Sequence, residues 1–126
     1  MEYSNEDCDI LVIEDDYDIR ESMRDALEIE GYNVITANNG KEGMMTLKSK
    51  PKTCLVMLDM VMPVMGGREF LDIIVKDKFL SKIPVLVVSS VATKENTLGA
   101  AGFLRKPADL DMILKIIKTY CPFPTV

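Results

Sequence analysis

The chain has 126 residues, of which 48% are hydrophobic, and its 15 basic and 20 acidic residues give a formal net charge of −5. This length fits one buried core and is too short for two, so we expect a single domain over residues 1–126 with its core in 9–119. The acidic balance argues against direct nucleic-acid binding, and no apolar run approaches the roughly 20 residues that a membrane span needs.

The first half of the chain alternates apolar runs with amphipathic segments. Residues 10–13 form the first predicted strand, and residues 17–30 form a helix that ends at Gly31. A short strand over 33–37 and a helix over 41–49 follow. The polar residues that flank 33–37 indicate a strand at an edge of the sheet.

The second half repeats this alternation. Residues 54–58 and 83–88 are predicted strands, with a helix over 67–77 between them and a short strand over 102–104 after them. The clearest helical stripe, with apolar side chains at i, i+3, i+4 and i+7, comes last: Leu110, Ile113, Leu114 and Ile117.

Strands that alternate with helices through short connections predict an α/β fold. We expect a doubly wound, five-stranded parallel sheet with right-handed crossovers and helices on both faces. The runs 10–13, 54–58 and 85–88 should be its central strands, because a strand buried on both faces has no polar side. The carboxyl ends of such strands meet at one edge, where doubly wound proteins bind their ligands.

Chemically active side chains follow four of these strands. They are Glu14, Asp15 and Asp16 after the first, Asp59 after the third, Ser89 after the fourth and Lys106 after the fifth. Carboxylates 4 Å apart repel by roughly 4 kcal/mol per pair at an effective dielectric near 20, so a cation is needed, and oxygen ligands of this kind suit Mg2+. Mg2+ and Lys106 together would balance three carboxylates, so this edge could hold an acyl phosphate.

Each of these residues also has an ordinary structural interpretation. A strand-end aspartate seen alone is more often a cap than a nucleophile, and Asp16 is most simply explained by the helix dipole. Ser89 could cap a loop, Lys106-Pro107 could begin a helix, and Phe103 could be plain core. Their occurrence together, in one order along the chain, favours a functional site.

The pattern Glu14-Asp15, Asp59-x-x-Met62-Pro63 with Gly67, Ser89 and Lys106-Pro107 resembles the signature of response-regulator receiver domains. The resemblance spans residues 9–119 and implies a single receiver domain with the flavodoxin-like strand order 2-1-3-4-5. It also implies a two-component signalling switch that catalyses only its own phosphorylation and dephosphorylation. The phosphoryl group would come from a histidine kinase or histidine phosphotransfer protein, and output would pass through contacts with a downstream protein target.

The resemblance also assigns residues to the phosphoacceptor and the metal. Asp59 is the phosphoacceptor, Asp15 binds Mg2+ directly, and Glu14 acts on the metal through water. Val61 provides a backbone carbonyl to the metal.

Three further residues take their roles from the same resemblance. Lys106 matches the amine that pairs with the acceptor and then with its phosphate. Ser89 matches the hydroxyl that moves to bond a phosphoryl oxygen, and Phe103 matches the aromatic switch.

One region departs from the receiver pattern. Only 17 positions separate Ser89 from Lys106, which is short for the family by roughly one and a half helical turns. Residues 93–98 can begin a helix, but Gly99 and Gly102 leave it little room. We therefore expect a shortened fourth helix and up to five helices in all. The family's usual interaction face includes this region, so the resemblance does not predict the oligomeric state.

The histidine and cysteine contents add two constraints. The sequence contains no histidine, which excludes a Ser-His-Asp triad and a phosphohistidine role for this chain. Cys8, Cys54 and Cys121 are widely separated, without the spacing of a zinc site or a disulfide framework, and Cys54 is expected to be a small core residue. The acidic, polar N-terminus is unlike a signal peptide and predicts a cytoplasmic protein.

Other interpretations stay open at this point. A receiver excised from a hybrid histidine kinase carries the same signature, although Met1 and the tail 121–126 favour a complete protein. A phosphohydrolase of the haloacid dehalogenase type also uses an aspartyl nucleophile, but it needs an acid where Val61 stands. In a flavin-binding module on this topology, Glu14-Asp15-Asp16 would repel the ligand phosphate.

Overall fold

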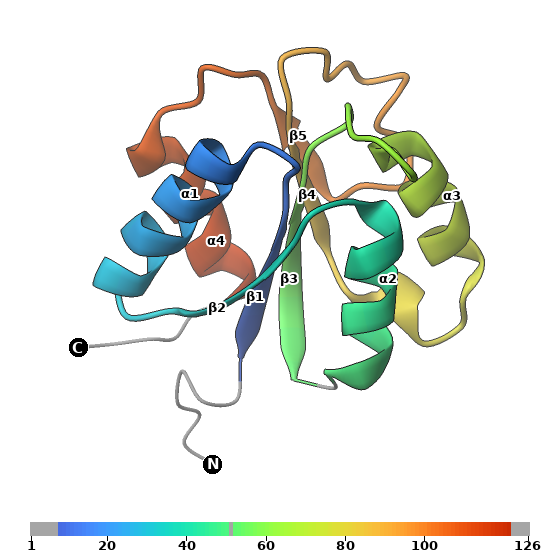
Figure 1. The fold of residues 1–126 in the computed structure, drawn as a ribbon, viewed down its shortest axis with the longest axis horizontal. Coiled ribbons are helices and arrows are strands. Elements are labelled where there is room, and N and C mark those ends of the chain that lie inside the picture. The colour runs from blue at the N-terminus through green and yellow to red at the C-terminus, as the bar shows by residue number, and fades with distance from the viewer. Residues whose placement is uncertain (1–7, 51, 122–126) are drawn as a thin grey trace.

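A five-stranded parallel sheet in the order β2-β1-β3-β4-β5 lies between two layers of helices in the computed structural model (Figure 1). The structure describes residues 8–50 and 52–121, so Met1 and the tail beyond Cys121 lie outside the described residues. The strands are β1 (Asp9–Ile13), β2 (Asn33–Ala37), β3 (Thr53–Leu58), β4 (Val85–Val88) and β5 (Gly102–Leu104). The predicted doubly wound fold is confirmed, with β1, β3 and β4 in the interior of the sheet and β2 at an edge.

The helices are α1 (Tyr17–Ile29), α2 (Gly40–Ser49), α3 (Gly67–Lys76) and α4 (Leu110–Tyr120), with a short 3-10 helix, η2 (Leu80–Lys82), before β4. The predicted bounds of the first three helices are confirmed to within a residue. The 3-10 helix was not predicted. No helix in the part of the chain that the structure describes has the length and apolar character needed to cross a bilayer.

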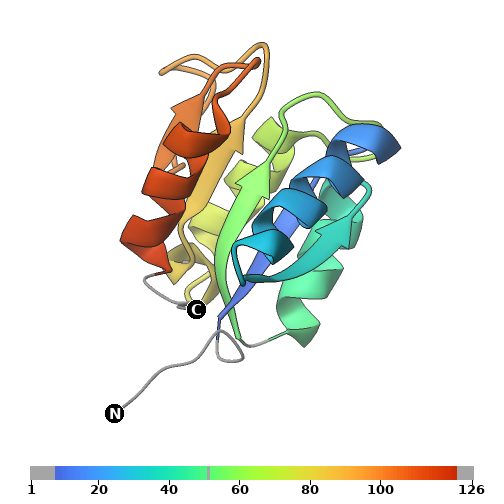
Figure 2. The same ribbon diagram turned by 90° about the vertical axis from the view of Figure 1, so that its left-hand side faces the viewer.

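Helices cover both faces of the sheet, and each face has its own core. Figures 1 and 2 show α1 and α4 side by side on one face, while α2 and α3 lie on the other. Alternate residues of a strand point to opposite faces, so Leu11 and Ile13 pack toward α2 and α3, whereas Ile10 and Val12 pack toward α1 and α4. This alternation decides toward which face of the sheet each side chain along a strand points.

Local signals in the sequence fix the ends of α1. Asp16 is its N-cap, and the Asp16 side chain accepts a hydrogen bond from the Ile19 amide at 3.0 Å. Gly31 follows the helix at a φ of 92°, a left-handed conformation that suits glycine, and its amide donates to the Glu28 carbonyl at 2.9 Å. The structural interpretation of Asp16 is therefore confirmed.

The connection from β4 to β5 contains no helix in the described structure. The expected shortened fourth helix is reduced to one turn, in which the Thr97 amide donates to the Thr93 carbonyl at 3.2 Å. Arg68 of α3 holds this segment, since its guanidinium donates at 2.8 Å to the carbonyls of Asn96 and Leu98. The described residues therefore contain four α-helices, within the predicted limit of five. In this connection, side-chain hydrogen bonds to the backbone take the place of the helical ladder.

Arg68→Ala should loosen the β4–β5 connection, because two backbone carbonyls lose a charged donor. We expect the free energy of unfolding to fall by about 1–2 kcal/mol and hydrogen exchange to accelerate over residues 93–100. Chemical denaturation and exchange measured by mass spectrometry check both effects.

Asp72→Ala is the matched control for this prediction. It removes the 2.9 Å ion pair between Arg68 and Asp72 but keeps the carbonyl contacts, and this pair is exposed. The loss should stay below about 0.5 kcal/mol. Equal losses in the two variants would contradict the role given to the carbonyl contacts.

Candidate functional site

Three carboxylates come together where β1 and β3 end. The two strands pair in parallel with Ile13 opposite Leu58, and the Asp59 amide donates to the Ile13 carbonyl at 3.1 Å. This register places Glu14 and Asp15 beside Asp59, with one carboxylate oxygen of each residue within 4.8 Å of the others. The predicted convergence of these acids at one sheet edge is therefore found.

Lys106 is the cation of this cluster. Its Nζ donates to Glu14 Oε1 at 2.6 Å and lies 3.7 Å from Asp59 Oδ2. The side chains of Glu14 and Asp59 are only 7% and 12% exposed, so these charges interact with little screening by water. Lys106 therefore bridges the two acids and contacts Glu14 more closely than Asp59.

Glu14 has a pKa that its surroundings raise. Burial raises its pKa above the ordinary value of 4.5, and the nearby Asp59 raises the pKa further. The hydrogen bond from Lys106, and a weaker one from the Asp16 amide at 3.2 Å, act in the opposite direction on the pKa. Glu14 is thus held next to a like charge that favours its protonated form, which a bound cation would reverse.

The loop after β3 holds Asp59 from the backbone side. Asp59 Oδ1 accepts a hydrogen bond from the Met60 amide at 2.7 Å, while Oδ2 faces Lys106. The Gly67 amide donates to the Met60 carbonyl at 3.0 Å, and a Cβ on Gly67 would lie only 2.7 Å from the Asp59 carbonyl oxygen. A glycine is therefore required at position 67 for the loop to close behind the acid.

Ser89 lies at the end of β4 and is completely buried. Its backbone joins the strands around Lys106, since the Ser89 amide donates to the Leu104 carbonyl at 3.1 Å and its carbonyl accepts from the Lys106 amide at 3.3 Å. Its hydroxyl accepts only a long bond, 3.5 Å, from the Val91 amide. A hydroxyl held this weakly can exchange its partner at low cost.

The other predicted residues lie around this centre. The Val61 side chain, in the loop after Asp59, is 62% exposed. Phe103 lies on the edge strand β5 and is 36% exposed, so the interpretation as plain core is wrong. Lys106-Pro107 does not begin a helix, because α4 starts at Leu110.

Arg20 was not predicted to take part in this site, yet it contacts the backbone next to the acids. Its guanidinium donates to the Glu14 backbone carbonyl at 3.1 Å and lies 5.4 Å from the centre of the Tyr17 ring. A basic residue one turn into a helix that follows three acids was the available signal. Arg20 partly offsets the negative charge of the cluster without contacting the Glu14 carboxylate.

The donor set fits Mg2+. The ligand atoms that Glu14, Asp15 and Asp59 offer are all carboxylate oxygens, which suit hard divalent cations. Three carboxylates and the Lys106 ammonium leave an excess of about two negative charges when ionised. A divalent cation would neutralise this excess.

The chain is similar to known signalling proteins. Residues 10–118 match the family of the response regulator receiver domain. The chain is 39% identical over 116 residues to the transcriptional regulatory protein CrdR of Helicobacter pylori, and 31% identical over 119 residues to sporulation initiation phosphotransferase F of Bacillus subtilis. These matches cover 88% and 90% of this chain.

Coverage of the relatives differs. The chain spans about half the length of several curated relatives, including 54% of CrdR, but 93% of phosphotransferase F. Among solved structures, that of response regulator protein TrrA from Thermotoga maritima, in complex with Mg(2+)-BeF, is similar with a TM-score of 0.80 at 28% identity. That match covers 89% of this chain and 97% of TrrA.

Two substitutions should move the pKa of Glu14 in opposite directions. Lys106→Met removes a hydrogen bond that lowers the pKa and should raise it further, while Asp59→Asn removes a negative charge and should lower it. Side-chain carboxyl NMR over a pH titration, without divalent cations, measures both shifts. Shifts of the same sign in the two variants would contradict the arrangement.

The same pKa predicts how stability depends on pH. Because folding raises the pKa of Glu14, the folded state binds its proton more tightly than the unfolded state does. The free energy of unfolding should therefore fall as the pH rises through the window just above 4.5. Glu14→Gln should remove this part of the pH dependence in denaturation measured across the window.

Proposed function

The chain belongs to the response regulator receiver domain family, and on this premise we propose that it is a phosphorylation-controlled switch whose phosphoacceptor is Asp59. Receiver domains are signalling phosphoacceptor domains of two-component systems, not enzymes that act on separate substrates. The observation that supports Asp59 is the position of its Oδ2, which lies at the sheet edge 3.7 Å from Lys106 Nζ, beside Glu14 and Asp15.

The reaction is transfer of a phosphoryl group to a carboxylate. An oxygen of Asp59 forms the new bond to phosphorus, and the bond from phosphorus to the donor's imidazole nitrogen breaks. The leaving imidazole nitrogen keeps the bonding electron pair, and the ring departs as neutral imidazole because its other nitrogen keeps its proton. The donor is a histidine kinase or histidine phosphotransfer protein, since these 126 residues contain no histidine that could supply the phosphoryl group.

Glu14, Asp15 and Asp59 would hold Mg2+, with the Val61 carbonyl as a further oxygen ligand. When bound, the ion would neutralise charge that gathers on the phosphoryl oxygens during transfer. Lys106 is placed to exchange its contact with Asp59 for one with a phosphoryl oxygen, since its Nζ already lies near that carboxylate. The acids hold Lys106 in place before transfer.

The response to phosphorylation would start at Ser89. Its weakly held hydroxyl would donate to a phosphoryl oxygen, and its backbone bonds to Leu104 and Lys106 would carry this movement into β5. Phe103 lies on that strand and lines a hollow with Lys94 and Leu98. Phosphorylation would then change the surface that a downstream protein contacts, with Phe103 as the aromatic switch.

We place the chain in the cytoplasm, where histidine kinases deliver phosphoryl groups, and assign its output to protein contacts. The net charge of −5 argues against direct nucleic-acid binding. The match to part of CrdR fits a receiver that belongs to a longer protein, and the match to most of phosphotransferase F fits a stand-alone receiver.

Incubation with acetyl phosphate and Mg2+ should add one phosphoryl group, about 80 Da, to the intact chain. The gain should be absent in Asp59→Asn and without a divalent cation, because both remove groups needed for transfer. Intact-mass spectrometry measures the adduct. An adduct of equal yield in Asp59→Asn would exclude Asp59 as the acceptor.

Ser89→Ala should separate phosphorylation from the response. The variant should still gain the phosphoryl group, because Asp59, Glu14 and Lys106 are unchanged. The shifts of amide NMR signals that phosphorylation causes over residues 89–106 should be reduced at least by half. Unchanged shifts in the variant would exclude Ser89 as the group that transmits the change, and Ser89→Thr should restore them.

A further inference from the structure

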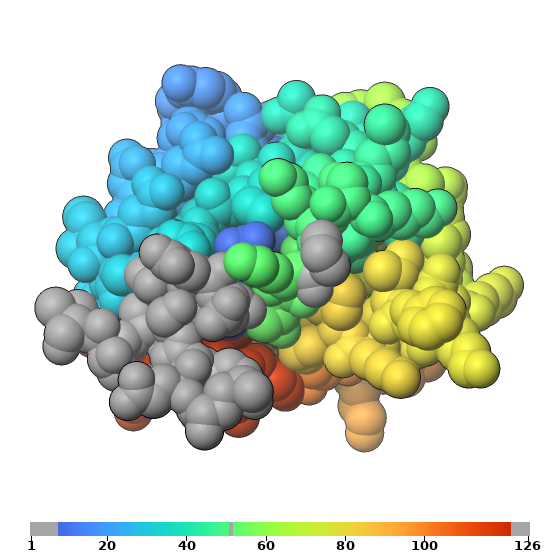
Figure 3. All heavy atoms as spheres, turned by 90° about the horizontal axis from the view of Figure 1, so that it is seen from below, coloured from blue at the N-terminus to red at the C-terminus, as the bar shows by residue number. Residues whose placement is uncertain are grey.

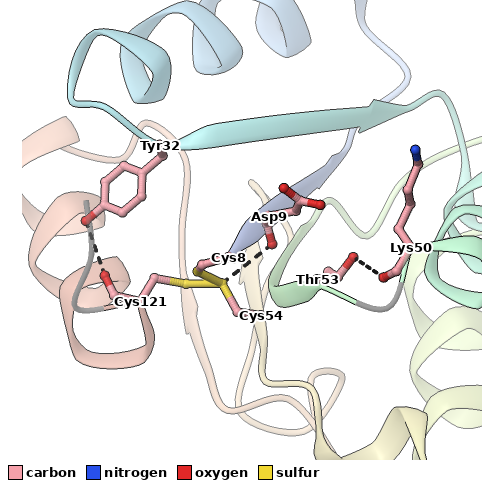
Figure 4. Close-up of a disulfide and its surroundings, with 7 residues drawn as sticks. All are labelled: Cys8, Asp9, Tyr32, Lys50, Thr53, Cys54 and Cys121. Atoms are coloured by element: carbon pink, nitrogen blue, oxygen red, sulfur yellow. Dashed lines mark hydrogen bonds between the residues drawn. A yellow bond between two sulfur atoms is a disulfide. The ribbon is translucent and has the colours of Figure 1, made fainter. Parts of the chain in front are cut away.

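A second group of reactive side chains lies at the end of the sheet opposite Asp59. Cys8 precedes β1, Cys54 lies near the start of β3 and Cys121 is the C-cap of α4. Their sulfur atoms lie within 4.8 Å of one another, and Cys54 lies at disulfide-bonding distance from both other cysteines (Figure 4). The expectation that the cysteines form no disulfide framework is therefore wrong.

An irregularity in strand pairing aims Cys54 at the other two cysteines. The register of β1 and β3 shifts between Asp9 and Ile10, whose partners are Thr53 and Leu55, so Cys54 is the extra residue. Strict alternation from Leu55 would turn Cys54 toward α2 and α3. With the extra residue, Cys54 packs on the same core as Leu55, Cys8 and Cys121.

Cys8 and Cys121 reach this face without any irregularity. Cys8 alternates with Ile10 and Val12, which face α1 and α4, and Cys121 follows the inward stripe of α4. Figure 3 looks onto this end of the molecule, where the start of β1 (blue) lies beside the start of β3 (green) and α4 (red) lies at the bottom of the view. Sequence spacing could not reveal this arrangement, because the three residues come from separate elements.

The surroundings favour a neutral disulfide over a metal bound by thiolates. Cys8 is 7% exposed and Cys121 is fully buried, and both belong to the core that also contains Ile117. A divalent cation bound by three thiolates would still leave one net negative charge in this apolar core, which carries a desolvation cost. A disulfide carries no charge and leaves the third sulfur as an uncharged thiol.

We propose that Cys54 is the shared partner of a reversible disulfide that closes on either Cys8 or Cys121. One sulfur forms only one disulfide, so the two contacts of Cys54 are alternatives. The Cα atoms are 5.3 Å apart in the pair with Cys8 and 6.6 Å apart in the pair with Cys121, and both distances suit a disulfide. Among the described cysteines, only pairs that include Cys54 lie at bonding distance.

The oxidation needs a hydroperoxide as its two-electron oxidant. Two thiols lose two protons and two electrons and form the sulfur–sulfur bond, while the peroxide oxygen–oxygen bond breaks to give an alcohol and water. A dithiol reductant reverses the step. Cytoplasmic disulfides are usually transient, which agrees with a reversible bond in this chain.

Exchange between the two pairs needs no further oxidant. The Cys121 thiolate attacks the Cys54 sulfur of a Cys8–Cys54 disulfide, forms the new bond and displaces Cys8 as a thiolate. Cys8 then takes up a proton in place of the one that Cys121 lost. The disulfide thereby moves from the start of β1 to the end of α4, and Cys54 of β3 is one of its two partners before and after the exchange.

The test counts free thiols in the full-length chain after treatment with hydrogen peroxide. Alkylation under denaturing conditions should label one cysteine in the oxidised monomer and all three after reduction, as measured by intact mass. Acid-quenched peptide mapping should find both the Cys8–Cys54 and the Cys54–Cys121 linkages. Three labelled cysteines after oxidation, or one linkage alone, would overturn the proposal.

Single substitutions identify the shared residue. Cys8→Ser and Cys121→Ser should each leave no labelled thiol after oxidation, whereas Cys54→Ser should leave two. Cys54→Ala repeats the thiol count with an apolar replacement. A folding defect of Cys54→Ser therefore cannot by itself account for the result. An intramolecular disulfide in both Cys54 variants would overturn the shared role.

Two further measurements keep this site separate from a metal site and from the phosphoacceptor. Reduced protein should retain no zinc after gel filtration, and one bound zinc per chain would overturn the disulfide proposal. Asp59→Asn should give the same thiol counts as the unsubstituted chain. Loss of phosphorylation and loss of the disulfide are therefore distinguishable outcomes.

Discussion

The parallel pairing of β1 with β3 is the constraint on which both ends of the molecule depend. At the carboxyl end, Ile13 opposite Leu58 brings the acids after β1 to Asp59. At the other end, the shifted register around Asp9 brings Cys54 to the face that carries Cys8. Both strands are buried on both faces, so neither can slip without exposing apolar side chains to water.

The two ends of β3 therefore offer opposite chemistry from one rigid element. At its carboxyl end, Asp59 lies beside the carboxyl oxygens of Glu14 and Asp15 and the Lys106 amine, which suit a hard cation and a phosphoryl group. Its amino end presents sulfur in an apolar core, where charge is unfavourable. The separation arises because the connections at the carboxyl ends of the strands carry the acids, while the cysteines pack among aliphatic residues.

Much of the fold and the site could be predicted from the sequence, because their signals are local. Unbroken apolar runs identify the central strands, Gly31 identifies a helix end, and an acid directly after a strand must lie at the sheet edge. The contacts of Arg68 and Cys54 could not be predicted in this way. Each depends on where separate elements meet in space, and for Cys54 on a register shift that adds one residue to β3.

The connection between β4 and β5 has almost no spare length. It comprises the 13 residues 89–101, which is close to the minimum of about a dozen that a crossover between parallel strands needs. With Arg68 fixing its middle, a deletion here would draw β5 out of register, while an inserted residue would cost little loop entropy. This segment can therefore accept insertions, which would lengthen it toward a full helix. It cannot accept deletions, because it is already near the shortest connection that keeps β5 in the sheet.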